Sequence, residues 1–230
     1  MRGAFVHIGT NIGMRSACPI FADGRFKYIP IPESYPSDES WTYEKLGLTE
    51  YVRSDWRYAH YDPEFISFTW GDFINRRTYV VRKLGGNDFV FFISTLQYKG
   101  VEAPLLSWID PNWAYYIIGY FELQSPVPFL KNETYPVRNE IRANFENNAH
   151  VRRDPMKNPK PFCLFKGTQR SKILEPFPVP ISRKNEPNDL AKAVLPSLNA
   201  ERPRWWSNSI IEESGVQRVF QEIRLQNQGA

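Results

Sequence analysis

Two short stretches of the chain hold the residue types that can move protons or recognise a base. His60-Tyr-Asp62 places an imidazole and a carboxylate two residues apart, and Asn147-Asn-Ala-His150 joins two amides to an imidazole. An imidazole beside a carboxylate is a common general acid or base near neutral pH, and an Asn amide can pair with a base edge. We therefore predict that Asp62, His60 and His150 are catalytic and that Asn148 contacts the substrate. The alternatives are a turn at the Asp-Pro dipeptide and a solvated loop around His150.

The sequence shows no sign of a metal site. His7, His60 and His150 are the only histidines, and their separations of 53 and 90 residues match no known ligand spacing. Cys18 and Cys163 do not form a C-x-x-C pair. We expect no metal, and no cofactor can be named from these residues.

Two further groups of residues have the chemistry of substrate contacts. The loop from Gly9 to Arg15 has two glycines and a basic residue, so its backbone N–H groups could face an anion, although it lacks the lysine of a P-loop. An arginine can bind phosphate, and a tryptophan flanked by polar residues can stack on a base. The predicted binding residues are Gly9, Asn11, Arg15, Asn148, Arg152, Trp108 and Trp205.

Charge is unevenly distributed along the 230 residues. The net charge is only +4, but residues 131–184 contain 12 Lys/Arg and 5 Asp/Glu, whereas residues 1–72 contain 7 and 10. A basic segment in a nearly neutral chain is typical of a local anion-binding face, and equally of a solvated surface. We predict nucleic acid (DNA or RNA) or a nucleotide as the partner.

The elements that would position these residues centre on two apolar stretches, 88–98 and 114–123. Alternate residues of the first stretch are apolar on both sides, which predicts a strand covered on both faces. Gly119 in the second stretch indicates a bulge or a close backbone approach. Near the C-terminus, Val216, Val219, Phe220 and Ile223 form the stripe of an amphipathic helix.

These patterns predict one α+β domain over residues 1–230. Its sheet would be mostly antiparallel and barrel-like, with the C-terminal helix packed on it. No apolar run reaches the roughly 18 residues of a membrane span, and no signal peptide is evident. We expect a cytoplasmic protein without membrane contact.

Several motifs together resemble a known family. They are Cys18-Pro-Ile-Phe-Ala-Asp-Gly-Arg25 with Ile29-Pro-Ile-Pro32, then His60-Tyr-Asp-Pro63, the two core strands and Asn147-Asn-Ala-His150. Together they are similar to the third type of nucleotide-modification-associated domain, over nearly the whole chain. The resemblance implies a role in modifying the bases of DNA or nucleotides. The core strands also look like the small barrels of the PUA and EVE type, which bind modified bases, a likeness at the level of the fold alone.

One departure from the family pattern concerns the first loop. The family tends to read Ser-Arg-Lys-Gly-Phe-Asp where this chain reads Val6-His-Ile-Gly-Thr-Asn11. A basic pair is lost, and Asn11 stands where the family has a carboxylate. If that carboxylate were catalytic, this chain would be impaired or would perform different chemistry.

Three functions are compatible with the sequence. The first is a nucleic-acid or nucleotide binding protein that takes part in base modification as an enzyme. The second is a non-catalytic reader of modified nucleic acid, with an aromatic pocket and a basic rim. The third is an interaction protein with no role in nucleic-acid chemistry.

Overall fold

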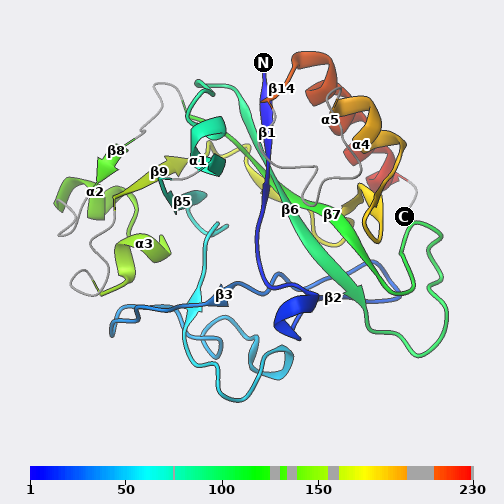
Figure 1. Ribbon diagram of the computed structural model, residues 1–230, viewed down its shortest axis with the longest axis horizontal. Helices are drawn as coiled ribbons and strands as arrows, with labels where there is room; N and C mark the ends of the chain where they lie inside the picture. The colour runs from blue at the N-terminus through cyan, green and yellow to red at the C-terminus, as the bar shows by residue number, and fades with distance from the viewer. Residues whose placement is uncertain (75, 125–129, 134–138, 155–160, 196–209, 229–230) are drawn as a thin grey trace.

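The computed structural model describes residues 1–74, 76–124, 130–133, 139–154, 161–195 and 210–228 (Figure 1). Trp205 lies outside these ranges. Within them, no helix has the length and apolar character needed to cross a membrane.

The two apolar stretches form the longest strands, as predicted. Strand β6 (Phe89–Tyr98) pairs with β7 (Trp113–Glu122) in antiparallel register. Strand β1 (Gly3–His7) lies parallel to β6 on its other side, and β2 (Cys18–Ile20) continues that edge. The order of the sheet is β10-β7-β6-β1-β14, and β11 also pairs with β7. The short strands are β10 (Lys172–Ile173), β11 (Val179–Pro180) and β14 (Ile210–Ile211).

Both faces of β6 are buried, which confirms the prediction from its alternating apolar residues. Phe89, Phe91 and Ile93 belong to one hydrophobic cluster, which includes the buried side of helix α5 (Glu213–Gln228). Val90 and Phe92 point the other way into a second cluster. The predicted C-terminal helix therefore packs on the sheet, next to α4 (Asp189–Val194), as Figure 1 shows.

Gly119 combines the two features predicted for it. The register of β6 and β7 shifts between Phe92 and Ile93, so that Gly119 lies next to a bulge. A Cβ atom at Gly119 would lie 2.8 Å from the ring of Phe65 and 2.8 Å from the carbonyl oxygen of Lys172. Only a residue without a side chain fits this position.

The predicted barrel is not present in the described part of the chain. The sheet ends at β10 and β14, which do not pair with each other, so it is open. Most of its pairs are antiparallel, as expected, but β1 and β2 run parallel to β6. An open sheet needs a cover on each face, and helix α5 supplies part of one cover.

A second group of small elements lies beside this sheet and carries the site. It contains a three-stranded sheet in the order β5-β9-β8 and the pair β3–β4. Its members are β3 (Ile31–Pro32), β4 (Ala59–His60), β5 (Thr69–Phe73), β8 (Leu130–Glu133), β9 (Phe162–Lys166), α2 (Asn139–Asn144) and α3 (Ala149–Arg152).

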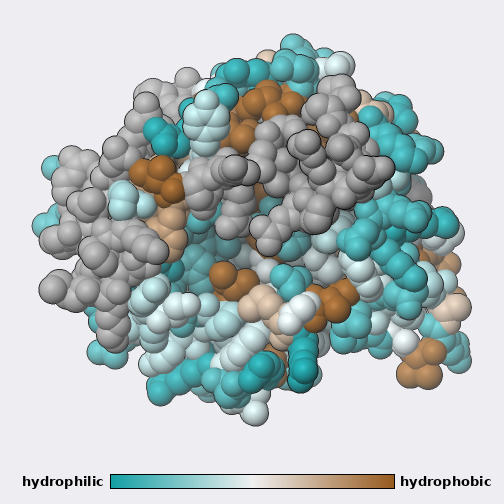
Figure 2. Space-filling model, viewed as in Figure 1, coloured by the Kyte–Doolittle hydropathy of each residue, from teal (hydrophilic) through white to brown (hydrophobic). Residues whose placement is uncertain are grey.

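The remaining elements are short. They are η1 (Ile12–Met14), η2 (Thr49–Tyr51), α1 (Arg76–Val81), β12 (Ser182–Arg183) and β13 (Glu186–Pro187). Among the residues that Figure 2 colours, most are hydrophilic, and the apolar patches are small and separate. The connection between β6 and β7 exposes two large apolar side chains, Val101 and Leu105.

Candidate functional site

His60 is positioned by the pairing of β3 with β4. Ile31 lies opposite His60 in this pair, and the next residues of the first segment bring Glu33 to the imidazole. The Nδ1 atom of His60 lies 2.6 Å from Oε2 of Glu33. Arg153 Nη2 lies 3.0 Å from the same nitrogen and 3.3 Å from Glu33. Because the carboxylate contact is the shorter one, we assign the ring proton to Nδ1, which leaves the lone pair on Nε2.

Asp62 follows two residues later and is held by three partners. The Gly71 N–H donates to both carboxylate oxygens, at 3.0 and 2.9 Å. The Nδ2 group of Asn148 donates to Oδ1 at 3.2 Å. The hydroxyl of Tyr28 donates to the backbone carbonyl of Asp62 at 2.9 Å. These bonds fix the carboxylate so that Oδ2 faces the two histidines.

His150 comes from helix α3, which packs beside β5 (Figure 1). Asn148 caps this helix, since its side-chain oxygen accepts from the His150 N–H at 2.9 Å. The same side chain donates to Asp62, so one amide ties the start of the helix to the carboxylate. The His150 ring stacks on Phe162 and meets the edge of Phe73.

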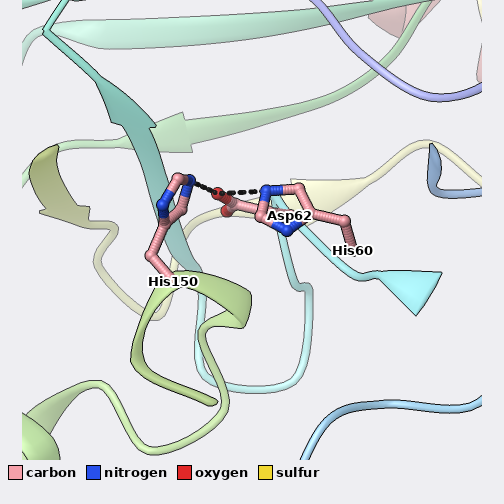
Figure 3. Close-up of side chains that lie close together, drawn as sticks. All are labelled: His60, Asp62 and His150. Atoms are coloured by element: carbon pink, nitrogen blue, oxygen red, sulfur yellow. Dashed lines mark ion pairs between the residues drawn. The ribbon is translucent and has the colours of Figure 1, made fainter. Parts of the chain in front are cut away.

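The three predicted catalytic residues therefore meet around one oxygen atom. Oδ2 of Asp62 lies 3.3 Å from Nε2 of His150 and 3.9 Å from Nε2 of His60 (Figure 3). The planes of the two imidazole rings meet at 83°, and the ring centroids are 4.8 Å apart. The side chains of Asp62 and His150 are only 1% and 2% exposed, whereas His60 is 12% exposed. His60 is thus the member of the cluster with the most solvent contact.

Burial governs the protonation of this cluster. It raises the pKa of Asp62 well above its usual range, against the opposing hydrogen bond from Gly71. Burial also lowers the pKa of His150 well below its usual range, helped by His60 and Arg153. Both shifts have the same cause, because burial disfavours the charged form of the carboxyl and of the imidazole alike.

Glu33 behaves in the opposite way. Burial alone would raise its pKa, but the hydrogen bond from His60 and the positive charge of Arg153 lower the pKa of Glu33 to about 2. At neutral pH an ionised carboxylate therefore contacts Nδ1 of His60. Glu33 and Gly71 were not among the predicted site residues, because nothing in their spacing links them to His60 or Asp62.

Arg152 and Arg153 are adjacent but differ in their surroundings. Arg152 donates to the carbonyls of Glu146 and Glu39 and to the side chain of Asn147, so its guanidinium is largely occupied. Arg153 is buried, and within the described ranges its Nε and Nη1 atoms have no hydrogen-bond partner. Phosphate binding by Arg152 stays a prediction, and Arg153 pairs with Glu33 in the interior.

The glycine loop and Trp108 do not contact this cluster directly, although Gly9 lies against Tyr28, whose hydroxyl donates to the Asp62 carbonyl. In Figure 1 the η1 turn lies next to β2, and the connection between β6 and β7 that carries Trp108 lies on the far side of the molecule from α3. Trp108 packs against Tyr116. The Thr10, Met14 and Arg15 N–H groups donate to backbone carbonyls. Substrate binding by Gly9, Asn11, Arg15 and Trp108 stays a prediction.

The comparisons with known proteins bear on the whole chain. No curated protein and no solved structure matches it. The model of the family described as nucleotide modification associated domain 3 matches residues 5–223, which confirms the resemblance found in the sequence. The chain belongs to the nucleotide modification associated domain 3 family.

Proposed function

We propose that this chain binds a nucleotide or nucleic acid and takes part in modifying its base, with His60, Asp62 and His150 as the groups that act on it. The family supports a role in nucleotide modification. The observation that carries the finer proposal is the convergence of the three side chains on Oδ2 of Asp62. That one domain spans residues 1–230 also stays a prediction.

The arrangement suits proton transfer to or from a base. A neutral imidazole accepts a proton, and a protonated carboxyl beside it donates one, so the pair can act in either direction. His60 has the greatest exposure of the three, so the substrate approaches from its side. Arg153 holds Glu33 and thereby helps to position the His60 ring for that substrate.

The first experiment measures binding of the purified chain to tRNA, single-stranded DNA, duplex DNA and free nucleotides across a salt series. Binding to a nucleic acid through phosphate contacts should weaken steeply as salt rises. Each bound class is then incubated with the chain and digested, and its nucleosides are analysed by mass spectrometry for a change in mass. No binding to any of these ligands would refute the proposal and favour an interaction protein.

Three variants separate an enzyme from a reader. His150→Ala and His60→Gln should abolish the mass change while thermal unfolding shows an intact fold, and His7→Gln, at the histidine outside the cluster, should not. Binding that persists in both cluster variants, without any base change in the wild type, would support the non-catalytic reader instead. Loss of that binding in Trp108→Ala would identify the stacking surface of such a reader.

A further inference from the structure

The cluster around Asp62 has the donor atoms and the spacing of a metal site. His60, Asp62 and His150 each offer one ligand atom, and these atoms lie within 4.8 Å of one another. Ligands bound at about 2.0–2.2 Å to one ion are roughly 3–3.6 Å apart. The His150–Asp62 separation of 3.3 Å is already in that range, the His60–Asp62 separation of 3.9 Å is slightly longer, and the widest separation in the set, up to 4.8 Å, must shorten when an ion binds. Figure 3 shows both rings directed at the carboxylate from opposite sides.

We propose that His60, Asp62 and His150 bind one divalent first-row transition-metal ion. The spacing of these residues in the sequence does not reveal such a site, because the β3–β4 pair and helix α3 bring them together only in the fold. Ion binding stands on the geometry alone. The use of the ion in base modification rests on the function proposed above.

The second observation is that neighbouring residues hold each of the three ligand side chains in position. A histidine that binds a metal usually donates its other ring N–H to a carboxylate or carbonyl, which orients the ring. Glu33 makes this contact with His60 at 2.6 Å, and Glu33 is itself held by Arg153 and by the Tyr35 N–H. Such a chain of contacts directs Nε2 of His60 toward Asp62.

The other two ligands have comparable support. Gly71 and Asn148 bind the Asp62 carboxylate, so that Oδ2 remains directed at the histidines. The Asn148 side chain accepts from the His150 backbone N–H, and the His150 ring is fixed against Phe162. All three ligands are therefore oriented before an ion arrives, which lowers the cost of binding.

The donor set identifies the class of ion. Two imidazoles and one carboxylate suit Zn(II), Fe(II) and similar ions, whereas Mg(II) and Ca(II) prefer oxygen ligands throughout. Three protein ligands leave coordination positions for water or substrate, which is typical of catalytic metal sites. Such an ion polarises a bound oxygen or activates a bound water.

The test uses the full chain without a histidine tag, stripped of metal by a chelator and titrated with Zn(II) in a calorimeter and with Co(II) by visible absorbance. We expect one equivalent of each ion, Co(II) bands of a protein site, and no comparable binding of Mg(II). His60→Gln and Asp62→Asn should lower Zn(II) affinity by more than about 100-fold, and Glu33→Gln, which changes only a positioning residue, by roughly 10–100-fold. His7→Gln is the matched control and should keep full affinity.

Several results would overturn the proposal. They are a stripped wild-type chain that binds neither Zn(II) nor Co(II), unchanged affinity in His60→Gln, and an equal loss in His7→Gln. If Asp62→Asn does not fold, as judged by thermal unfolding, His60→Gln and Glu33→Gln decide the question. Base modification that continues unchanged in metal-free protein would refute the use of the ion in that reaction and leave the proposed function standing. One equivalent of bound metal without any nucleotide activity would support the site and refute that function.

Discussion

Gly71→Ala tests whether the cluster is packed as tightly as the structure shows. Gly71 lies in β5 opposite Leu164. A Cβ atom there would lie 2.8 Å from Cδ2 of the His150 ring and 2.9 Å from Cδ2 of Leu164, with the Cys163 carbonyl at 3.2 Å. Real Cβ contacts do not come so close, so the methyl group must displace the buried ring or the strand. Overpacking of this kind lowers the free energy of unfolding by about 1–3 kcal/mol. Because two of the close contacts are with buried side chains, we expect a loss of about 2 kcal/mol in Gly71→Ala.

The measurement is urea unfolding of Gly71→Ala beside Gly85→Ala. Gly85 is the matched control, because its added Cβ would meet only a carboxylate oxygen of Asp88, at 3.9 Å. We expect Gly85→Ala to stay within about 0.5 kcal/mol of the wild type. Gly71→Ala should also bind Zn(II) more weakly, because the displaced His150 ring no longer faces Asp62. Wild-type stability and Zn(II) affinity in Gly71→Ala would refute the packing on which the site depends.

Three further predictions concern other parts of the structure. Phe92→Ala removes a fully buried ring from the central strand and should cost about 3–5 kcal/mol in urea unfolding, unless the core collapses around the gap. Arg153→Met removes the cation beside the buried carboxylate of Glu33 and should lower the free energy of unfolding by about 3–5 kcal/mol. A double-mutant cycle with Glu33→Gln should show that the two losses are coupled, and additive losses would contradict an interaction between the two residues. Burial raises the pKa of Tyr116 to about 12 and that of Tyr43 still further. The free energy of unfolding should therefore keep its full value below about pH 10, where tyrosine begins to ionise in the unfolded chain, and should fall as the pH rises toward 12. Thermal midpoints followed with tyrosinate absorbance would show this fall, and a flat profile would contradict it.

Local patterns predicted the elements of this fold well and their partners poorly. The core strands and helix α5 follow from residues that repeat at fixed short intervals, and Gly119 follows from the lack of a side chain in a crowded strand. The barrel was not observed, because closure depends on which strands pair. The parallel pairing of β1 and β2 with β6 joins segments about 80 residues apart, and periodicity carries no information on such contacts.

The same distinction separates the site residues that were predicted from those that were missed. His60, Asp62, Asn148 and His150 were predicted from the residue types and spacing of two short motifs, and the fold brings these side chains together. Glu33 resembles any acidic residue until the β3–β4 pair brings it to His60. Gly71 contributes only its N–H and its small size, neither of which distinguishes it from the other glycines of the sequence. The supporting contacts are therefore a property of the fold, whereas the reactive groups are visible in the sequence.

The position of Asn11 changes the meaning of the departure from the family pattern. Asn11 precedes the η1 turn, where its backbone carbonyl accepts from the Met14 N–H, and this turn lies next to β2 rather than beside α3. The carboxylate of the cluster comes from Asp62, and Gly71 and Asn148 hold it without any contribution from the first loop. Loss of an acidic group at position 11 thus leaves the acid–base and metal-binding groups complete. Substrate binding by the first loop stays a prediction, separate from the acid–base and metal-binding roles proposed for the Asp62 cluster.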